Sequence, residues 1–153
     1  IPLLAAGGIA TGNGMMAAMA LGADGVQIGS RFVASKESSA HEAFKNAVLL
    51  ANEGDTQLTL KELAPVRLLK NKFYQDLQSL YKKTPTPEDL KNLLGRARAK
   101  RGMFEGDLEE GELEIGQISG LIDEIAPVSD IVNSIITEFK ACQIRISTIN
   151  LKN

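Results

Sequence analysis

The sequence has very little cysteine, histidine or tryptophan. It contains one cysteine, Cys142, one histidine, His41, and no tryptophan. A lone cysteine excludes an internal disulfide and fits a reducing compartment, so we expect a cytoplasmic protein. Long hydrophobic runs are absent too, because no apolar run in the sequence approaches the roughly 20 residues that a helix needs to span a bilayer.

An excess of charge of one sign is also absent. The 17 lysines and arginines nearly balance the 19 aspartates and glutamates, which leaves a net charge of −2. This balance provides no general attraction to nucleic acid or to an anionic membrane, and we expect neither as a partner. Hydrophobic residues make up 44% of the 153 residues, which is enough for one globular core.

The first 32 residues carry the most informative pattern. Two short apolar runs, 1–6 and 25–29, lead into glycine turns, and a run of small residues and methionines, 15–21, lies between them. Apolar runs without polar alternation are typical of parallel strands covered on both faces. Alanine, leucine and methionine favour a helix. The pattern therefore predicts a βαβ unit with parallel strands and a right-handed crossover.

Glycines at the ends of both predicted strands indicate an anion site. Gly7 and Gly8 follow the first strand, while Gly29 and Ser30 follow the second. Glycine lets backbone amides approach a ligand, and the N-termini of the helices that follow add unpaired donors and positive partial charge. We therefore predict a phosphate cradle at these turns, the alternative being ordinary turn glycines.

The same stretch resembles the last two strands of FMN-dependent TIM-barrel enzymes, through residues 5–10 and 22–32. The continuation over residues 33–41 is similar to the nitronate monooxygenase family (also called 2-nitropropane dioxygenases), which includes FMN-dependent enoyl-acyl-carrier-protein reductases. A second block, 106–122, resembles the carboxyl-terminal region of the same family. The resemblance extends from Ile1 to about residue 140.

This resemblance implies an α/β fold that is the carboxyl-terminal part of a (β/α)8 TIM barrel. Residues 1–52 would be the end of the FMN-binding barrel, with strands 7 and 8 and their helices. Residues 53–140 would be a mainly helical region, and 141–153 a disordered or foreign tail. The chain begins inside a predicted strand without an initiating methionine. We therefore expect a fragment that is not a competent enzyme alone, since a barrel needs all its strands.

The resemblance also implies non-covalently bound FMN. Its phosphate and ribityl chain would be held by five residues: Gly8, Gln27, Ile28, Gly29 and Ser30. The catalytic base would lie upstream of Ile1, so no residue of this chain is expected to be the catalyst.

Two enzymatic hypotheses and one non-enzymatic hypothesis follow. We favour a nitronate monooxygenase, in which the flavin passes electrons from an alkyl nitronate to O₂, giving a carbonyl compound and nitrite. The alternative is an enoyl reductase, in which NAD(P)H reduces the flavin and an enoyl thioester, presented by an acyl carrier protein, accepts the hydride. The third hypothesis is an inactive phosphate-binding or structural fragment.

Three further features have weaker functional interpretations. His41 does not match the position of a base on an earlier barrel strand, so we predict a structural or surface role near the rim of the active site. Gln117 lies among glycines, and a ligand contact and helix packing both remain open. A basic cluster comprises Arg96, Arg98, Lys100 and Arg101. It is either a solvated helix end or a docking patch for an acidic partner or a nucleotide phosphate.

Beyond the βαβ unit the pattern is mainly helical. Thr86, followed by proline and two acidic residues, is a typical N-cap, and apolar spacing extends its helix to Ala97. Residues 56–60 alternate like a short strand. The other predicted helix starts are Ser38 or Ser39, the region of Asn71, and Ser129 or Asp130.

Overall fold

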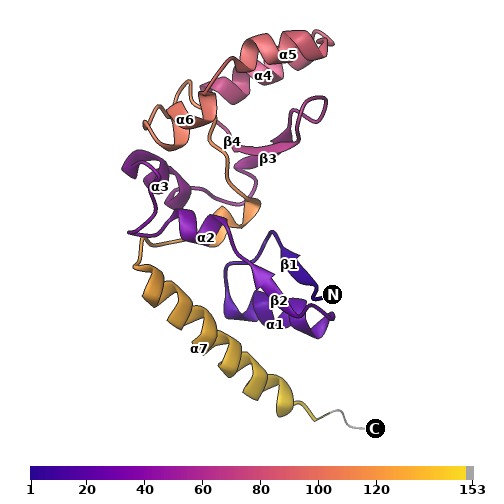
Figure 1. Cartoon of the computed structure of the whole chain (residues 1–153), viewed down its shortest axis with the longest axis vertical. Coiled ribbons are helices and arrows are strands. Elements are labelled where there is room, and N and C mark those ends of the chain that lie inside the picture. The colour runs from indigo at the N-terminus through magenta and orange to yellow at the C-terminus, as the bar shows by residue number, and fades with distance from the viewer. Residues whose placement is uncertain (151–153) are drawn as a thin grey trace.

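The computed structural model describes residues 1–150 of the chain. In chain order its elements are β1 (Leu4–Ala6), α1 (Gly12–Ala20), β2 (Gly25–Gln27), α2 (Ser30–Val33), α3 (Glu42–Leu49), β3 (Thr56–Thr59), β4 (Val66–Leu69), α4 (Lys72–Tyr81), α5 (Pro87–Leu94), α6 (Arg98–Met103), the 3-10 helix η1 (Gln117–Leu121) and α7 (Val128–Ser147). They form an elongated mixed α/β molecule (Figure 1). The hairpin β3–β4 with α4 and α5 lies at one end, and α7 lies at the other.

The amino-terminal unit has the predicted βαβ order. β1 and β2 pair in parallel, with Leu4 opposite Gly25 and Ala6 opposite Gln27. Helix α1 connects them and begins at Thr11, whose Oγ1 accepts a hydrogen bond from the amide of Gly14 over 3.1 Å. This contact satisfies one of the unpaired donors of the first helical turn.

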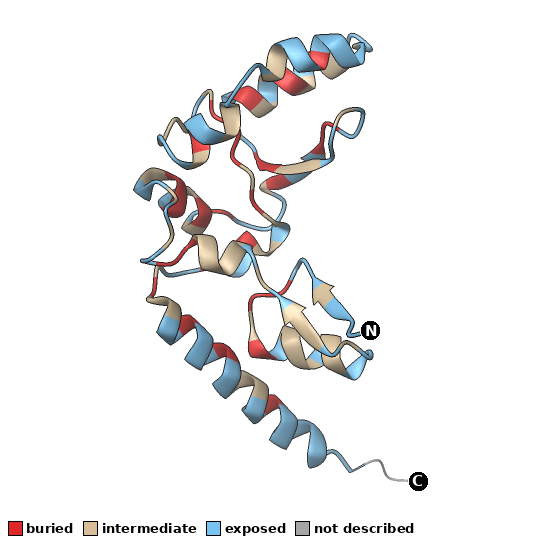
Figure 2. Cartoon of the chain, in the orientation of Figure 1, coloured by how far each residue is buried: buried red, intermediate tan, exposed pale blue. Residues whose placement is uncertain are grey.

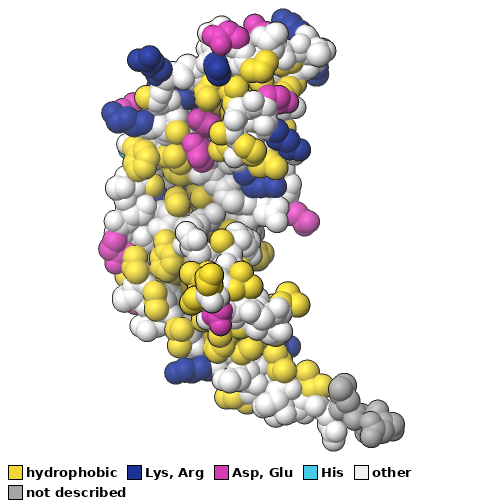
Figure 3. Space-filling model, turned by 45° about the vertical axis from the view of Figure 1, so that its right-hand side comes forward, with side chains coloured by type: hydrophobic (Ala, Val, Ile, Leu, Met, Phe, Trp, Pro, Cys, Tyr) yellow, Lys and Arg dark blue, Asp and Glu magenta, His cyan; other side chains and the backbone are white. Residues whose placement is uncertain are grey.

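The predicted burial of the first strand is not found in this chain. Leu4 is 58% exposed, and Leu3 before it is 62% exposed. Within residues 1–150, β1 pairs with β2 alone, and no other described segment covers the side chains of Leu3 and Leu4. Figure 2 shows these strands in the exposed and intermediate colours, while buried residues occur from α7 at one end of the molecule to α4 and α5 at the other. Figure 3 shows hydrophobic side chains on the surface of one face of the molecule.

Helix α7 packs against α1, and Gly12 makes this contact possible. The amide of Gly12 donates to Oε2 of Glu138 over 2.8 Å. A Cβ on Gly12 would lie 2.2 Å from the carbonyl oxygen of Ile135. Ile131 and Ile135 are buried between the helices, where Met15 packs against them. The N-terminus of α1 is thus bound by a carboxylate of the same chain, contrary to the expectation that it adds free donors to an anion site.

The last helix exists as predicted, but its ends differ. Its N-cap is Pro127 and not Ser129 or Asp130, because the helical turn already begins at Val128. The helix continues to Ser147, and Cys142 within it is buried. The expected disorder therefore does not extend to residues 141–147, which are helical. The end of the predicted tail, 151–153, lies outside the described residues.

A core in the middle of the chain is built around α3. Phe44 and Val48 are fully buried there and pack with residues of the later block, including Leu113 and Ile115. The N-cap of α3 is His41, whose Nδ1 accepts from the amide of Ala43 over 3.1 Å. The prediction that Ser38 or Ser39 caps this helix is wrong, since the helix starts later, at Glu42.

The hairpin β3–β4 is antiparallel, with Thr56 opposite Leu69. β3 agrees with the predicted strand, whereas β4 was not predicted. The amide of Leu69 donates to the carbonyl of Leu113 over 2.9 Å, and the amide of Ile115 donates to the carbonyl of Arg67 over 3.1 Å. β4 therefore lies between β3 and residues 113–115 of the 106–122 block. This pairing brings the next residue, Gly116, to Ser30 at the end of β2.

Helices α4 and α5 confirm the predicted starts. Asn71 caps α4, and Thr86 caps α5 in a capping box with Asp89. The apolar stripe, however, does not continue one helix to Ala97. α5 ends at Leu94 because Gly95 and Ala97 both adopt positive φ, and a separate short helix, α6, follows.

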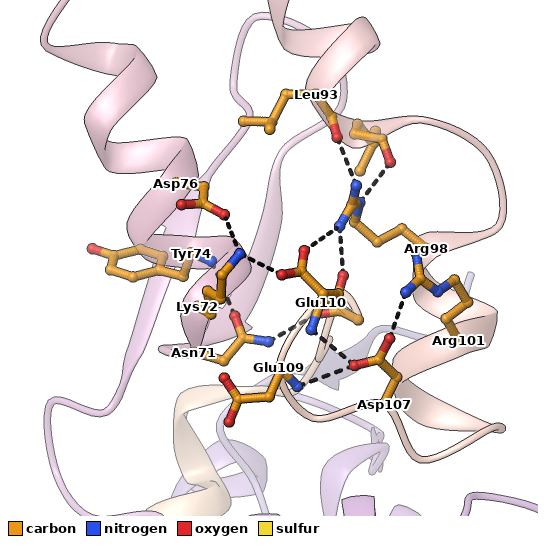
Figure 4. Close-up of polar contacts among 12 residues, drawn as sticks. Asn71, Lys72, Tyr74, Asp76, Leu93, Arg98, Arg101, Asp107, Glu109 and Glu110 are labelled. Carbon is orange, nitrogen blue, oxygen red and sulfur yellow. Dashed lines mark hydrogen bonds and ion pairs between the residues drawn. The ribbon is translucent and has the colours of Figure 1, made fainter.

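One arginine of the basic cluster, Arg98, is used inside the molecule, while Arg101 and Lys100 form ion pairs at the surface (Figure 4). Arg98 donates to the main-chain oxygens of Leu93 and Glu110, and its guanidinium lies 4.5 Å from the ring centroid of Phe73. Arg101 pairs with Asp107 over 2.6 Å, and Lys100 pairs with Glu105 over 2.9 Å. Arg98 therefore ties α5, α6 and the glutamate-rich loop together, and the cluster is not simply a solvated helix end.

No helix within residues 1–150 is long and apolar enough to cross a membrane.

Candidate functional site

A hollow of about 250 Å³ lies at the carboxyl ends of β1 and β2. Four of the five predicted FMN-binding residues line it: Gly8, Gln27, Gly29 and Ser30. The fifth, Ile28, does not line it and packs instead with the cluster of Ile131 and Ile135 under α7. Because successive residues of an extended chain point to opposite sides, Gln27 and Ile28 face different surroundings.

The glycines at this hollow leave its walls bare. Gly7 and Gly8 have φ values of 87° and 69°, and a Cβ on either would meet no atom within 4 Å. This left-handed backbone is costly for other residues, so the turn itself accounts for these two glycines. A Cβ on Gly29 would also meet nothing within 4 Å, although its φ of −108° is accessible to any residue.

Ser30 joins the hollow to the second block of the sequence. Its Oγ accepts a hydrogen bond from the amide of Gly116 over 3.0 Å, and a Cβ on Gly116 would lie 2.7 Å from that Oγ. The serine uses a lone pair in this contact, so its hydroxyl hydrogen remains available to a ligand. Gly116 and Ile118 complete the lining of the hollow. These two residues were not predicted as site residues.

Two larger hollows adjoin the first. One, of about 500 Å³, shares Gly8 and Ile118 with it and includes Gln117. The other, of about 410 Å³, shares Gly29, Ser30 and Gly116 with it. The structure thus places Gln117 in the hollow next to the predicted cradle and not in the cradle itself.

Arg67 lines both of the larger hollows. Arg67 was not predicted as a site residue, because β4 was not predicted. The available signal was an arginine between the apolar residues Val66 and Leu68, in a short run that follows Pro65, which disfavours a helix before it.

Acidic side chains lie on the block that reaches the hollows. Burial raises the pKa of Glu114, which lines the hollow beside Gly29 and Ser30. Burial, with repulsion from Glu114, raises the pKa of Glu112 to about 7, while the positive charge of Arg98 opposes this shift. Glu112 lies outside the hollows described above, so its perturbed titration belongs to the packing of the block.

His41 lies away from the predicted cradle. Its ring caps α3 and contacts Gly106 so closely that a Cβ there would lie 2.3 Å from Nδ1. None of the three hollows at the strand ends includes it. The contacts of His41 with the amide of Ala43 and with Gly106 agree with a structural role.

Comparisons with known proteins agree with one another. The family model described as "Nitronate monooxygenase" matches residues 1–138. A "Probable nitronate monooxygenase" of Bacillus subtilis is 36% identical over 140 residues, which are 90% of this chain and 40% of that protein.

Solved structures extend the likeness to the fold. FabK from Thermotoga maritima has a TM-score of 0.89 and 42% identity, covering 96% of this chain and 47% of that one. A nitroalkane oxidase from Streptomyces ansochromogenes has a TM-score of 0.73 and 31% identity, covering 95% of this chain and 41% of that one. The chain thus spans less than half the length of these relatives. The match over residues 1–138 shows that the chain belongs to the nitronate monooxygenase family.

Proposed function

We propose that this chain is the phosphate-binding, carboxyl-terminal part of an FMN-dependent oxidoreductase. In this proposal β1 and β2 are the last two strands of a (β/α)8 barrel, whose other strands lie upstream. The coverage of 40–47% of the relatives' length supports this. The exposure of Leu3 and Leu4 supports it too, since side chains of barrel strands are buried in the barrel interior or beneath its outer helices.

Gly29 carries the proposal. Apart from Gly14, which lies within helix α1 and whose Cβ would make only ordinary contacts, every other glycine of the chain either has a positive φ or would place a Cβ within 3.4 Å of a neighbour. Gly29 has neither restriction, so neither its backbone conformation nor packing within residues 1–150 explains the missing side chain. A ligand that lies against the backbone at this point would explain it, because only glycine permits such an approach.

The residues present fit a phosphate ester. The open walls at Gly8 and Gly29 admit close approach to backbone, and the Ser30 hydroxyl supplies a neutral donor whose position is held by Gly116. Gln27 adds a side-chain amide at the same hollow. The flavin, when bound, supplies the electron chemistry, and these residues hold its phosphate and thereby fix the flavin's position relative to the substrate.

Oxidation of alkyl nitronates with O₂ is the activity we favour for the whole enzyme. The family match and the curated relative from Bacillus subtilis support it. The second candidate is NAD(P)H-dependent reduction of an enoyl thioester. The greater likeness to FabK, with 42% identity against 31% for the nitroalkane oxidase, supports this candidate.

A comparison of FMN with riboflavin tests the phosphate cradle. In the full-length protein that carries this chain, FMN should bind more tightly than riboflavin, which lacks only the phosphate, by about 10- to 100-fold. Gly29→Val should remove most of this difference, because its side chain enters open space in the hollow. Ala20→Val, at the exposed end of α1, is the control and should leave it unchanged. Equal affinities for FMN and riboflavin would overturn the proposal.

Turnover assays separate the two activities. Oxygen consumption and nitrite release with propyl-2-nitronate select the monooxygenase. Oxidation of NADH or NADPH that depends on crotonyl-coenzyme A, without nitronate turnover, selects the reductase.

The isolated chain gives a separate test of the barrel proposal. Residues 1–153 alone should bind no FMN at high micromolar concentration and should lack both activities, because the rest of the site would lie upstream. Tight binding of FMN by residues 1–153 would refute the proposal that they are an incomplete part of the site.

A further inference from the structure

Arg67 is a charged side chain that the flavin cradle does not use. It lies in β4 and is half-buried. Its Nη1 donates to the main-chain oxygen and to Oγ1 of Thr56, both over 3.2 Å. Within residues 1–150 no hydrogen bond or ion pair engages its Nε or Nη2. A guanidinium has five N–H donors, so this side chain is anchored at one end and keeps several donors for a ligand.

The position of Arg67 is beside the cradle and not inside it. Arg67 does not line the hollow at the strand ends. It lines the hollow that opens from Gly8 past Gln117, and also the one that contains Gly29 and Ser30. A ligand in either of these hollows would be adjacent to a flavin whose phosphate occupies the cradle.

The surroundings leave the guanidinium free to accept an anion. Glu53 and Glu114 line the same two hollows, but neither forms an ion pair with Arg67. The contact with Thr56 fixes the orientation of the planar group before a ligand arrives, and such a fork matches the oxygens of a phosphate.

We propose that Arg67 binds a phosphate ester of a second ligand, distinct from the flavin, in the hollow that opens from Gly8 past Gln117. This inference rests on the proposed function for its placement of the flavin in the neighbouring hollow. The diphosphate of a nicotinamide nucleotide and the phosphates of a coenzyme A thioester share the required chemistry. The nitronate reaction needs no such group, so the assignment favours the reductase activity.

Direct binding tests the assignment. The probes are ADP and coenzyme A, titrated calorimetrically into the full-length, FMN-loaded protein. Arg67→Met should weaken at least one probe by about 10- to 100-fold, the loss expected when a charge-assisted hydrogen bond is removed. Its affinity for FMN should stay within about twofold. Arg96→Met, at an exposed arginine outside the hollows, is the matched control and should change neither.

Kinetics then identify the source of the phosphate. A raised KM for NADH or NADPH assigns Arg67 to the nucleotide. A raised KM for crotonyl-coenzyme A, with unchanged KM for crotonyl-N-acetylcysteamine, which has no phosphate, assigns it to the thioester. If Arg67→Met lowers the folded fraction, Arg67→Lys is used in its place, because lysine keeps the charge. It should still weaken binding of the affected probe by about threefold or more, since lysine lacks the planar fork of the guanidinium.

Two outcomes would overturn the assignment of Arg67, and a third would overturn only the proposed flavin function. Unchanged binding of both probes in Arg67→Met, or unchanged binding in Arg67→Lys where Arg67→Met does not fold, overturns the assignment. Loss of FMN together with the probes also overturns it, because Arg67 would then hold the flavin. If flavin-free protein binds ADP through Arg67 but never binds FMN, the proposed flavin function fails while the anion site stands.

Discussion

Gly12→Ala tests the contact between α1 and α7, which positions the βαβ unit. The added methyl would lie 2.2 Å from the carbonyl oxygen of Ile135 and 2.3 Å from the amide nitrogen of Phe139. Both atoms belong to the backbone of α7, so no side-chain rotation relieves the clash. Helix α7 would have to move by roughly 1 Å or more to restore an ordinary contact.

The cost follows from two terms. Forcing a methyl into a packed contact costs about 1–3 kcal/mol. The displacement also weakens the hydrogen bond from the Gly12 amide to the Glu138 carboxylate, and such charge-assisted bonds contribute about 1.5–3 kcal/mol. We therefore expect Gly12→Ala to lower the free energy of unfolding by about 3–5 kcal/mol, a large share of the about 5–15 kcal/mol typical of a domain.

Gly14→Ala in the same helix is the matched control. Its Cβ would lie 3.4 Å from Oγ1 of Thr11 and 3.7 Å from Ile9, which are ordinary contacts. The alanine should stabilise α1 by about 0.5–1 kcal/mol through its higher helix propensity and its lower entropy in the unfolded chain. The two substitutions add the same group two residues apart and should act in opposite directions.

Urea unfolding followed by far-ultraviolet circular dichroism measures the difference. With a slope of about 2 kcal/mol per molar urea, Gly12→Ala should lower the midpoint by about 1.5–2.5 M. Gly14→Ala should raise it slightly. Equal midpoints for Gly12→Ala and the unmodified protein would refute the packing of α7 on α1. Equal losses in both variants would instead place the effect within α1.

Three further outcomes are expected. The raised pKa of Glu112, about 7, means that the folded state keeps a proton that the unfolded chain loses above pH 4.5, so stability should fall as pH rises from 4.5 to 7. Glu112→Gln should remove most of this fall, since only the smaller contribution of Glu114 remains, and should stabilise the protein at pH 8 by on the order of 2 kcal/mol. Urea unfolding at several pH values measures the effect, with the exposed Glu109→Gln as control. An undiminished pH dependence in Glu112→Gln would assign the slope to another group. Thr86→Ala removes the capping box of α5 and should lower the free energy of unfolding by about 1 kcal/mol, with faster hydrogen exchange confined to the first turn of α5. The control Ser79→Ala, within α4, should leave hydrogen exchange in α5 unchanged. Unchanged exchange in Thr86→Ala would contradict the cap. Arg98→Met removes the contacts that hold α6 to α5 and Phe73, and it should lower the thermal unfolding midpoint by several degrees. Arg96→Met should leave this midpoint unchanged. Equal midpoints for the two variants would contradict the internal role of Arg98.

Local patterns predicted the elements whose signals lie within a few residues. The glycine-bounded apolar runs predicted the parallel pair β1 and β2, and Thr86 followed by Pro87 predicted the start of α5. These succeeded because strand pairing across a short crossover and helix capping depend on neighbouring residues. The family resemblance, carried by two blocks of residues, was confirmed by the comparisons.

Several boundaries could not be read from the sequence because contacts between distant residues decide them. His41 caps α3 where two serines seemed better placed, and its ring fits against Gly106, which lies far along the chain. β4 reads as an irregular stretch until the backbone of residues 113–115 pairs with it. Helix α7 runs past the family-like region because its buried face continues to Cys142.

The sequence by itself determined the family, the βαβ unit and the glycines at the strand ends, since these depend on residue type and short spacing. The tertiary structure decided which residues meet there. It placed Gly116 on Ser30, turned Ile28 away from the hollow, and brought Arg67 from an unpredicted strand to its rim. Those placements depend on the pairing of β4 with the later block, and backbone pairing between distant segments leaves no local signature in the residues themselves.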